Sequence, residues 1–425
     1  MQRFVGILGI LVLIGAAFLL STNRKAVKPR IIFWGLGLQF IFALIILRTG
    51  PGEWFFIQCN NIIMAVLNCA QAGASFVFGG LVNRFVEVGK IDPSGTFTSF
   101  EGLVANTGMA MFAFSVLPTI IFFSALMSIT YHYGIMQRVV SFTAKIMSKT
   151  MKTSGSESLS ATANIFLGQT EAPLVIKPYL QKMTSSELNA IMVGGFTTIA
   201  GGVMAAYVGL LKDSVPNIAG HLMSASIMCA PAGLMMAKIM IPETEVSETA
   251  GGSKLPIVKI HRNGIDAAAA GTTDGLHLAL NVAAMLIAFI GIIAMINLGL
   301  GLVYKDLTLA SIFGWLLSPL AWLMGIPWID AHKFADLLGT QVMVNEFVAY
   351  AKLGGYASQM TERSQILATY ALCGFCNLSS IGIQIGGISA LVPERRGDLA
   401  RLGLRAMAAG AFATWCTCCM AGILL

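Results

Sequence analysis

Two short stretches of this sequence place a carboxylate inside otherwise apolar runs. GQTEAP (168–173) carries Glu171, and VNEFVAY (344–350) carries Glu346. A charged side chain at the centre of a membrane segment costs about 2.5 to 3.5 kcal/mol, so it normally faces a cavity or a partner. We therefore interpret both stretches as parts of a polar binding site within the membrane.

The polar residues near these carboxylates narrow the chemistry of that site. Together they suit a neutral ligand that is rich in hydroxyls and amide-like edges and has one flat face, whereas an anionic solute would be repelled by both glutamates. Backbone carbonyls of unwound helices, with hydroxyls beside them, would complete an oxygen shell for sodium. The pooled set is Gln169, Thr170, Glu171, Thr198, Asn345, Glu346, Phe375, Asn377, Ser379 and Ser380.

Other interpretations of these residues remain open. The glutamates could be structural, paired with Lys177, Lys333 or Lys352. An intramembrane hydrolase would need HExxH or a Ser and His arrangement, and neither is recognisable. A channel would show a continuous pore rather than two occluding segments. A carrier of another neutral hydroxylated solute, such as a free base or a sugar, also fits.

The composition shows which elements must position these residues. The 425 residues are 56% hydrophobic and 11% charged, which leaves too little polar surface to cover a water-facing globule. The apolar runs have the length of spanning helices and lack the short alternation of a barrel. The net charge is +7, and the basic residues lie at the ends of apolar runs. This placement indicates that they orient the protein in the membrane and do not bind a nucleic acid. We expect an all-α integral membrane protein.

The basic residues also predict a topology. They gather around residues 24–30, 138–152, 238–262 and 395–405, and the positive-inside rule makes all four clusters cytoplasmic, with both termini outside. Eight crossings satisfy this arrangement. The expected spans are 4–21, 31–47, 109–132, 188–211, 218–241, 278–303, 365–390 and 400–425.

Two of these spans are interrupted, and each follows one of the acidic stretches. TTIAGG (197–202) breaks the fourth span and NLSSIG (377–382) breaks the seventh. If an acidic stretch crossed the membrane, the number of crossings between two cytoplasmic basic clusters would no longer be even. Each stretch should therefore be a re-entrant hairpin, and the two should enter from opposite faces. An inverted repeat of hairpins and interrupted helices is typical of secondary transporters.

The expected organisation has seven parts, including interfacial helices that lie along the membrane surface. They are 1–52, two scaffold helices; 53–108, interfacial helices; 109–152, a scaffold helix and a basic cytoplasmic segment; 153–241, the first transport repeat; 242–264, a mobile cytoplasmic linker; 265–308, a scaffold helix near an oligomer contact; and 309–425, an interfacial helix and the second transport repeat.

Four stretches resemble the signatures of the concentrative nucleoside transporter family. They are GQTEAP, VNEFVAY, CGFCNLSSIG (373–382) and GLHLALNVAAMLIAFIG (275–291), and the likeness covers the chain from about residue 70 to its end. The resemblance implies a symporter, not an enzyme, that imports nucleosides such as uridine across the inner membrane by alternating access. It implies sodium as the co-transported ion, with protons as the alternative, and a homotrimer in the lipid bilayer.

The resemblance also implies roles for individual residues. Those expected to bind the nucleobase are Gln169, Thr170 and Glu171, with Val203 and Leu278 against the ring and Phe375 closing the pocket. Those expected to hold the ribose hydroxyls are Glu346, Asn377 and Ser380. Those expected to bind sodium are the backbone of Asn164, Leu167, Thr198 and Ile199 and the hydroxyls of Thr170 and Thr198.

Overall fold

The computed structural model of the chain describes residues 2–82, 85–91, 93–94, 97–105, 112–250, 261–305 and 307–425. The long elements of the first half are α1 (Gln2–Leu19), α2 (Pro29–Arg48), α3 (Gly50–Phe78), β1 (Phe85–Ile91), β2 (Phe97–Ala105), α4 (Leu117–His132), α5 (Ile135–Met151), α6 (Gly155–Ala163), η4 (Ala172–Lys182), α7 (Ser185–Thr197), α8 (Gly201–Leu211) and α9 (Ile218–Met240). Those of the second half are α10 (Gly264–Val303), α11 (Leu309–Leu323), α12 (Trp328–Met343), α13 (Glu346–Tyr356), α14 (Glu362–Ala371), α15 (Leu378–Ser389) and α16 (Arg396–Leu424).

The helical fold class expected from the sequence is confirmed, and the described residues of the eight expected spans are helical apart from the breaks in the fourth and seventh. By length and composition, five described helices could cross a membrane, or seven if each of two bent pairs counts as one span. One bent pair is α4 and α5, which meet at 75°, and the other is α11 and α12, which meet at 116°. Apolar helices of this length are what a bilayer core about 30 Å thick requires.

The prediction of helices throughout 53–108 is wrong for part of that segment. Residues 85–105 include an antiparallel pair, β1 and β2, in which Val86 faces Val104 and Ile91 faces Phe97. Val86 and Val88 flank Glu87 in FVEVGKI, a short alternation that is typical of a strand but is hard to separate from the apolar run before it. The preceding α3 is one helix of 29 residues, long enough to span, and its interfacial placement stays a prediction.

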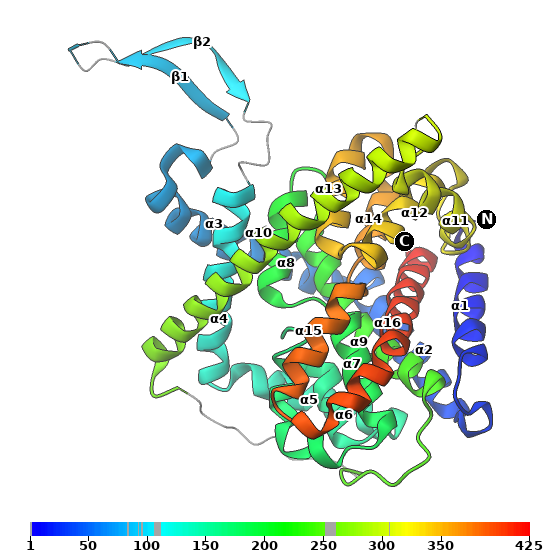
Figure 1. Cartoon of the computed structure of the whole chain (residues 1–425). Coiled ribbons are helices and arrows are strands. Elements are labelled where there is room, and N and C mark those ends of the chain that lie inside the picture. Colours follow the sequence, from blue (N-terminus) through cyan, green and yellow to red (C-terminus); the bar gives the residue numbers. More distant parts are fainter. Residues whose placement is uncertain are drawn as a thin grey trace.

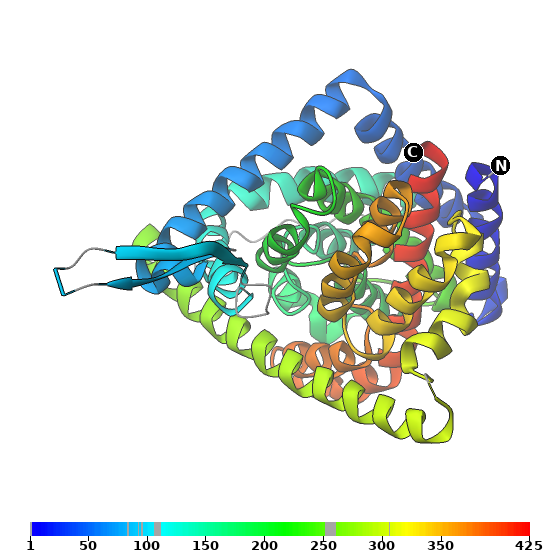
Figure 2. The same cartoon turned by 90° about the horizontal axis from the view of Figure 1, so that it is seen from above.

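The helices form a core that is flanked by two long elements. α16 packs against α7 and α9, α1 packs against α16, and α10 packs against α4 (Figure 1). Seen from above, α3 and α10 run along two sides of the molecule, and the β1–β2 ribbon protrudes where they converge (Figure 2). α7, α9 and α16 are therefore the interior helices, whereas α10 is largely exposed.

The two interrupted spans break at defined places. The first break lies between α7 and α8, at Thr198–Ala200, within the predicted TTIAGG. The second lies between α14 and α15, at residues 372–377, just before most of the predicted NLSSIG. The difference arises because the Asn377 side chain accepts a hydrogen bond from the backbone of Ser380 and so starts α15 (2.8 Å).

The two breaks cross each other in close contact. A Cβ on Gly374, in the second break, would lie 2.5 Å from the carbonyl oxygen of Phe196, which is just before the first break. The Cys376 thiol donates to the same carbonyl (3.0 Å). Only a glycine permits this approach, so the crossing fixes the two repeats against each other.

Candidate functional site

The first acidic stretch forms the tip of a helical hairpin. A capping box, in which Ser154 and Glu157 bond reciprocally, starts α6, and η4 packs back against α6. Residues 164–171 turn between them, and the backbone N–H of Gly168 donates to the Glu171 carboxylate (3.2 Å). The tip thus carries Gln169, Thr170 and Glu171 together.

The second acidic stretch forms the tip of another hairpin, made of α12 and α13, which pack together. The Asn345 side chain accepts from the backbone N–H of Val348 (2.8 Å) and caps α13. Glu346 is therefore the first residue of α13, where the positive end of the helix dipole favours a carboxylate.

Glu346 is the centre of a buried polar cluster that joins three elements. Tyr207, on α8, donates to one carboxylate oxygen (3.0 Å), and the Asn377 amide, at the start of α15, donates to the other (2.8 Å). The Tyr207 ring stacks on Tyr350, with centroids 4.3 Å apart. Each carboxylate oxygen can accept a further hydrogen bond, so the cluster is suited to holding hydroxyl donors of a solute.

Gln169 brings the first hairpin to this cluster. Its amide nitrogen donates to the Ser380 hydroxyl at 3.5 Å, which joins the tip of the first hairpin to α15 of the second repeat. Gln384, also on α15, lies with Gln169 against Gly195 of α7. In the described part of the chain, the buried side-chain oxygens of Gln169 and Gln384 accept no hydrogen bond. Two buried acceptors are thus available to a ligand.

Gln384 was not among the candidate residues expected from the sequence. Gln384 is fully buried, and its amide donates to the carbonyl of Met192 (3.1 Å). It follows Asn377 by seven residues, which places both on one face of α15. That spacing was the signal that could have identified it.

Glu171 lines a cavity of about 450 Å³. Leu167, Ala200, Asp274 and Leu278 share the walls of this cavity, and Glu346 is not among its lining residues. The predicted substrate residues therefore fall into two groups, one around Glu171 and one around Glu346. The hydrogen bond from Gln169 to Ser380 joins the groups.

The remaining predicted residues are placed as follows. Val203 and Phe375 are buried, and Leu278 is half-buried in the cavity wall with Glu171. The Thr170 side chain lies against Gly387 of α15. Thr170 is thus brought to the second repeat.

Most residues of the predicted sodium site lie around the first break. The Thr198 hydroxyl donates to the carbonyl of Gly194 (3.2 Å), and the Asn164 side chain lies against the same glycine. The Gly201 N–H donates to the carbonyl of Phe166 (3.1 Å), which holds the hairpin tip beside the break. Among the described residues, the buried Asn164 side-chain oxygen accepts no hydrogen bond. Such an orphaned oxygen suits a small cation.

The structure does not support the alternative in which lysines neutralise the two glutamates. Lys352 pairs with Asp336 (3.0 Å), and Lys333 donates to the carbonyl of Gln359 (3.1 Å). Lys177 lines the cavity that Glu171 lines, but the ion pairs of the described residues include neither Glu171 nor Glu346.

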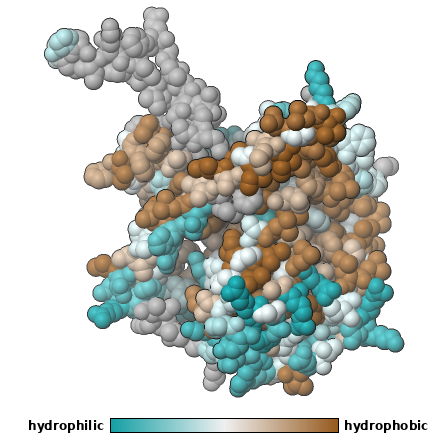
Figure 3. All heavy atoms as spheres, in the orientation of Figure 1, coloured by the Kyte–Doolittle hydropathy of each residue, from teal (hydrophilic) through white to brown (hydrophobic). Residues whose placement is uncertain are grey.

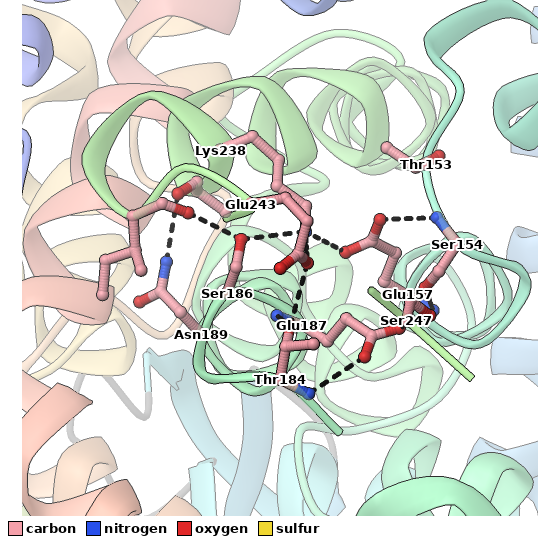
Figure 4. A network of polar contacts seen from close by, with 12 residues as sticks. Thr153, Ser154, Glu157, Thr184, Ser186, Glu187, Asn189, Lys238, Glu243 and Ser247 are labelled. Carbon is pink, nitrogen blue, oxygen red and sulfur yellow. Dashed lines mark hydrogen bonds and ion pairs between the residues drawn. The ribbon is translucent and has the colours of Figure 1, made fainter. Parts of the chain in front are cut away.

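A buried ion pair that the sequence does not predict holds the base of the first hairpin. The ammonium of Lys238, at the end of α9, lies 2.6 Å from Glu157 and 3.2 Å from Glu243, and it donates to the Ser186 hydroxyl (2.9 Å; Figure 4). The side chains of Lys238 and Glu157 are each 2% exposed. This cluster ties α6, α7 and α9 together at one end.

Part of the segment expected to be a mobile linker folds against this cluster. The Ser247 hydroxyl donates to Glu187 (2.5 Å), and the Gly155 N–H donates to the carbonyl of Thr249 (3.0 Å). Residues 242–250 therefore cover the base of the hairpin, whereas 251–260 lie outside the described residues. From the sequence, Lys238 is expected only as a member of a basic cluster.

Family models match most of the chain. A model described as the C-terminus of Na+ dependent nucleoside transporters matches residues 221–422, and the corresponding N-terminal model matches residues 8–81. A third model, described as a gate for nucleoside recognition, matches residues 113–214, which include the first hairpin and the first break.

Similar proteins occur in bacteria and mammals. A Haemophilus influenzae protein described as an uncharacterized transporter is 43% identical over 100% of this chain and 98% of its own length. Sodium/nucleoside cotransporter 1 of Rattus norvegicus is 40% identical over 100% of this chain, which spans 64% of the length of that relative.

Solved structures share the whole fold. A structure of CNTnw in an inward-facing substrate-bound state has a TM-score of 0.88 and 40% identity, and covers 100% of this chain and 98% of its own. A structure of a CNTnw variant in an outward-facing state has a TM-score of 0.87 at the same identity and coverage. With these relatives and the matched family models, the chain belongs to the concentrative, Na+ dependent nucleoside transporter family.

Proposed function

We propose that this chain is a sodium-coupled symporter that imports nucleosides across the inner membrane. The family, and the inward-facing and outward-facing structures of its relatives, support nucleoside transport by alternating access in a multi-pass membrane protein. The observation that carries the finer proposal is the buried Glu346 carboxylate between Tyr207 and Asn377. A carboxylate held there without a lysine is suited to accepting hydrogen bonds from sugar hydroxyls.

In this proposal the two groups of residues bind the two parts of a nucleoside. Glu346, Asn377 and Ser380 hold the ribose hydroxyls. The nucleobase lies against the tip of the first hairpin, where Gln169, Thr170 and Glu171 contact its edge and Val203, Leu278 and Phe375 contact its ring. The bond from Gln169 to Ser380 would open as substrate enters, because at 3.5 Å it is at the long limit of a hydrogen bond.

Sodium would bind at the first break, and its binding there would be coupled to the binding of the nucleoside. Its proposed ligands are the backbone oxygens of Asn164, Leu167, Thr198 and Ile199 and the hydroxyls of Thr170 and Thr198. The Thr170 side chain, on the first hairpin tip, lies against Gly387 of α15 and would turn from there toward the ion. The ion would order the hairpin tip, so nucleoside would bind better after sodium, and the coupling is reciprocal. A membrane potential contributes about 2.3 kcal/mol per charge per 100 mV, which drives accumulation by one to two powers of ten.

The moving unit would contain both hairpins and both interrupted helices. Their mutual crossing at Gly374 and the ties of Lys238 favour motion as one body against α4 and α10, which pack on each other. We propose a homotrimer, with α10 near the contact, because this helix leaves many large apolar side chains exposed.

The test is uptake of labelled uridine into vesicles that contain the purified protein. We expect accumulation with an inward sodium gradient, and none with potassium alone. Uptake that follows a proton gradient without sodium would establish proton coupling instead. Competition by ribose or by free uracil that matches competition by uridine would show that the carrier accepts a different solute class.

A further inference from the structure

A second large cavity lies at the base of the first hairpin; it shares Gln137 with the cavity that Glu171 lines, but none of the predicted substrate residues. Its volume is about 1560 Å³, and it opens between the start of α2, the length of α5 and the start of α6. Its floor includes the closed ion pair of Lys238 with Glu157. The cationic side chains that line its walls are Lys28, Arg30, Arg138, Lys145, Lys149 and Lys152.

The carboxylates in the lining only partly offset these wall cations: Glu157 and Glu243 pair with Lys238, and Glu245 is the third. Within the described residues, none of the six forms an ion pair with a carboxylate. The guanidinium of Arg30 donates to the carbonyl of Thr150 at the end of α5 (2.9 Å), which holds α2 and α5 side by side. A concave site with this surplus of positive charge is suited to binding a phosphate group.

The exposed face of α5 indicates where such a phosphate comes from. Ile135, Val139 and Phe142 follow helical spacing and form an apolar stripe; Phe142 is 68% exposed. Arg138 and Lys149 lie on the adjacent strip of the same helix, between this stripe and the cavity. Cations beside an exposed apolar stripe are typical of a helix at a membrane interface.

The placement of α5 agrees with that assignment. It turns 75° away from α4, so it runs close to the membrane plane if α4 crosses the bilayer. Hydrophilic residues gather at the end of the molecule where α5 and α6 lie, below a broad hydrophobic band (Figure 3). The cavity therefore lies at the hydrophilic end of the molecule, which is where lipid headgroups would be if α4 crosses the bilayer.

We propose that this cavity binds the headgroup of an anionic phospholipid, with an acyl chain along Ile135, Val139 and Phe142. The phosphate lies between the cations of α2 and those of α5. The bound lipid thus links the scaffold helix α2 to the segment that enters the first hairpin. This site contains none of the predicted substrate residues and does not depend on the proposed transport function.

The test measures lipid binding to purified protein in detergent by native mass spectrometry, with phosphatidylglycerol and phosphatidylcholine compared. Each cation near an anionic lipid contributes about fivefold in affinity, so the triple variant Arg138→Gln/Lys145→Gln/Lys149→Gln should bind phosphatidylglycerol on the order of 100-fold more weakly. The matched control is Lys25→Gln/Arg396→Gln/Arg405→Gln, three exposed cations outside the cavity, and it should bind like the wild type.

A second variant separates a lipid from a soluble anion. Phe142→Gln removes apolar surface and leaves the cations, so it should weaken phosphatidylglycerol binding about tenfold without changing binding of inorganic phosphate. Equal losses in both triple variants would overturn the proposal in favour of diffuse surface charge. Equally tight binding of inorganic phosphate and phosphatidylglycerol, with no effect of Phe142→Gln, would overturn it in favour of a soluble phosphate.

Discussion

Replacing Glu346 with glutamine tests the role of the buried carboxylate most directly. The wild-type oxygens accept from Tyr207 and from the Asn377 amide. In Glu346→Gln the side chain keeps its size but loses its charge, and its new NH2 group is a donor where the site requires an acceptor. We expect the protein to fold, because one amide oxygen still accepts from one of the two partners.

The magnitude follows from the hydrogen bond that a sugar hydroxyl would make. Hydrogen bonds to charged groups contribute about 1.5 to 3 kcal/mol, so losing one weakens uridine binding by about 10-fold to 150-fold. The assay is calorimetric titration of purified protein with uridine and with its 2′-deoxy and 3′-deoxy analogues. The wild type should discriminate against at least one analogue, and Glu346→Gln should discriminate far less.

A matched control lies on the same hairpin. Asp336 is equally buried, on α12, but its carboxylate binds Lys352 and Tyr356. Asp336→Asn should therefore lower thermal stability without changing the preference for uridine over its deoxy analogues. The reasoning is refuted if Glu346→Gln retains the full wild-type discrimination, or if Asp336→Asn removes it to the same extent.

Three further predictions concern stability and coupling. Lys238→Met leaves buried carboxylates without their cation and should cost about 3 to 5 kcal/mol in denaturant titrations, whereas Lys182→Met, in an exposed pair, should cost less than about 1 kcal/mol. Thr198→Ala should raise the sodium concentration needed for half-maximal uptake more than it changes the uridine KM; an unaltered sodium titration would contradict the ion-site assignment. Gly374→Ala should clash with a carbonyl and abolish folded protein in size-exclusion profiles, while Gly382→Ala, which has open space, should behave like the wild type.

The sequence predicted the two acidic hairpins and the interrupted helices because polar residues in an apolar run carry a strong cost, and so stand out. Glu171 and Glu346 both lie at the tips of hairpins, as expected. The break before α15 was misplaced by a few residues, since the side chain of Asn377 starts the helix earlier than glycine and serine content suggests.

Contacts between segments that are distant along the chain could not be predicted from the sequence. Lys238 pairs with Glu157, which is 81 positions earlier in the sequence. A basic residue at the end of an apolar run is ordinarily interpreted as an orientation signal, so this pairing was not expected. The division of the predicted site into a group around Glu171 and a group around Glu346 likewise depends on how the hairpin tip turns. The β1–β2 ribbon was missed because its alternation is short and follows an apolar helix.

The glycine crossing between the two interrupted spans has a mechanical consequence. Gly374 lies so close to the carbonyl of Phe196 that a methyl group would not fit between them, and the Cys376 thiol donates to the same carbonyl. We therefore expect the two halves of the internal repeat to tilt together. In the proposed transport cycle, a nucleoside held between Gln169 and Glu346 would then move together with both halves as one rigid unit. Release on the far side would then require only that the hairpin tips separate, without a rearrangement of the two halves.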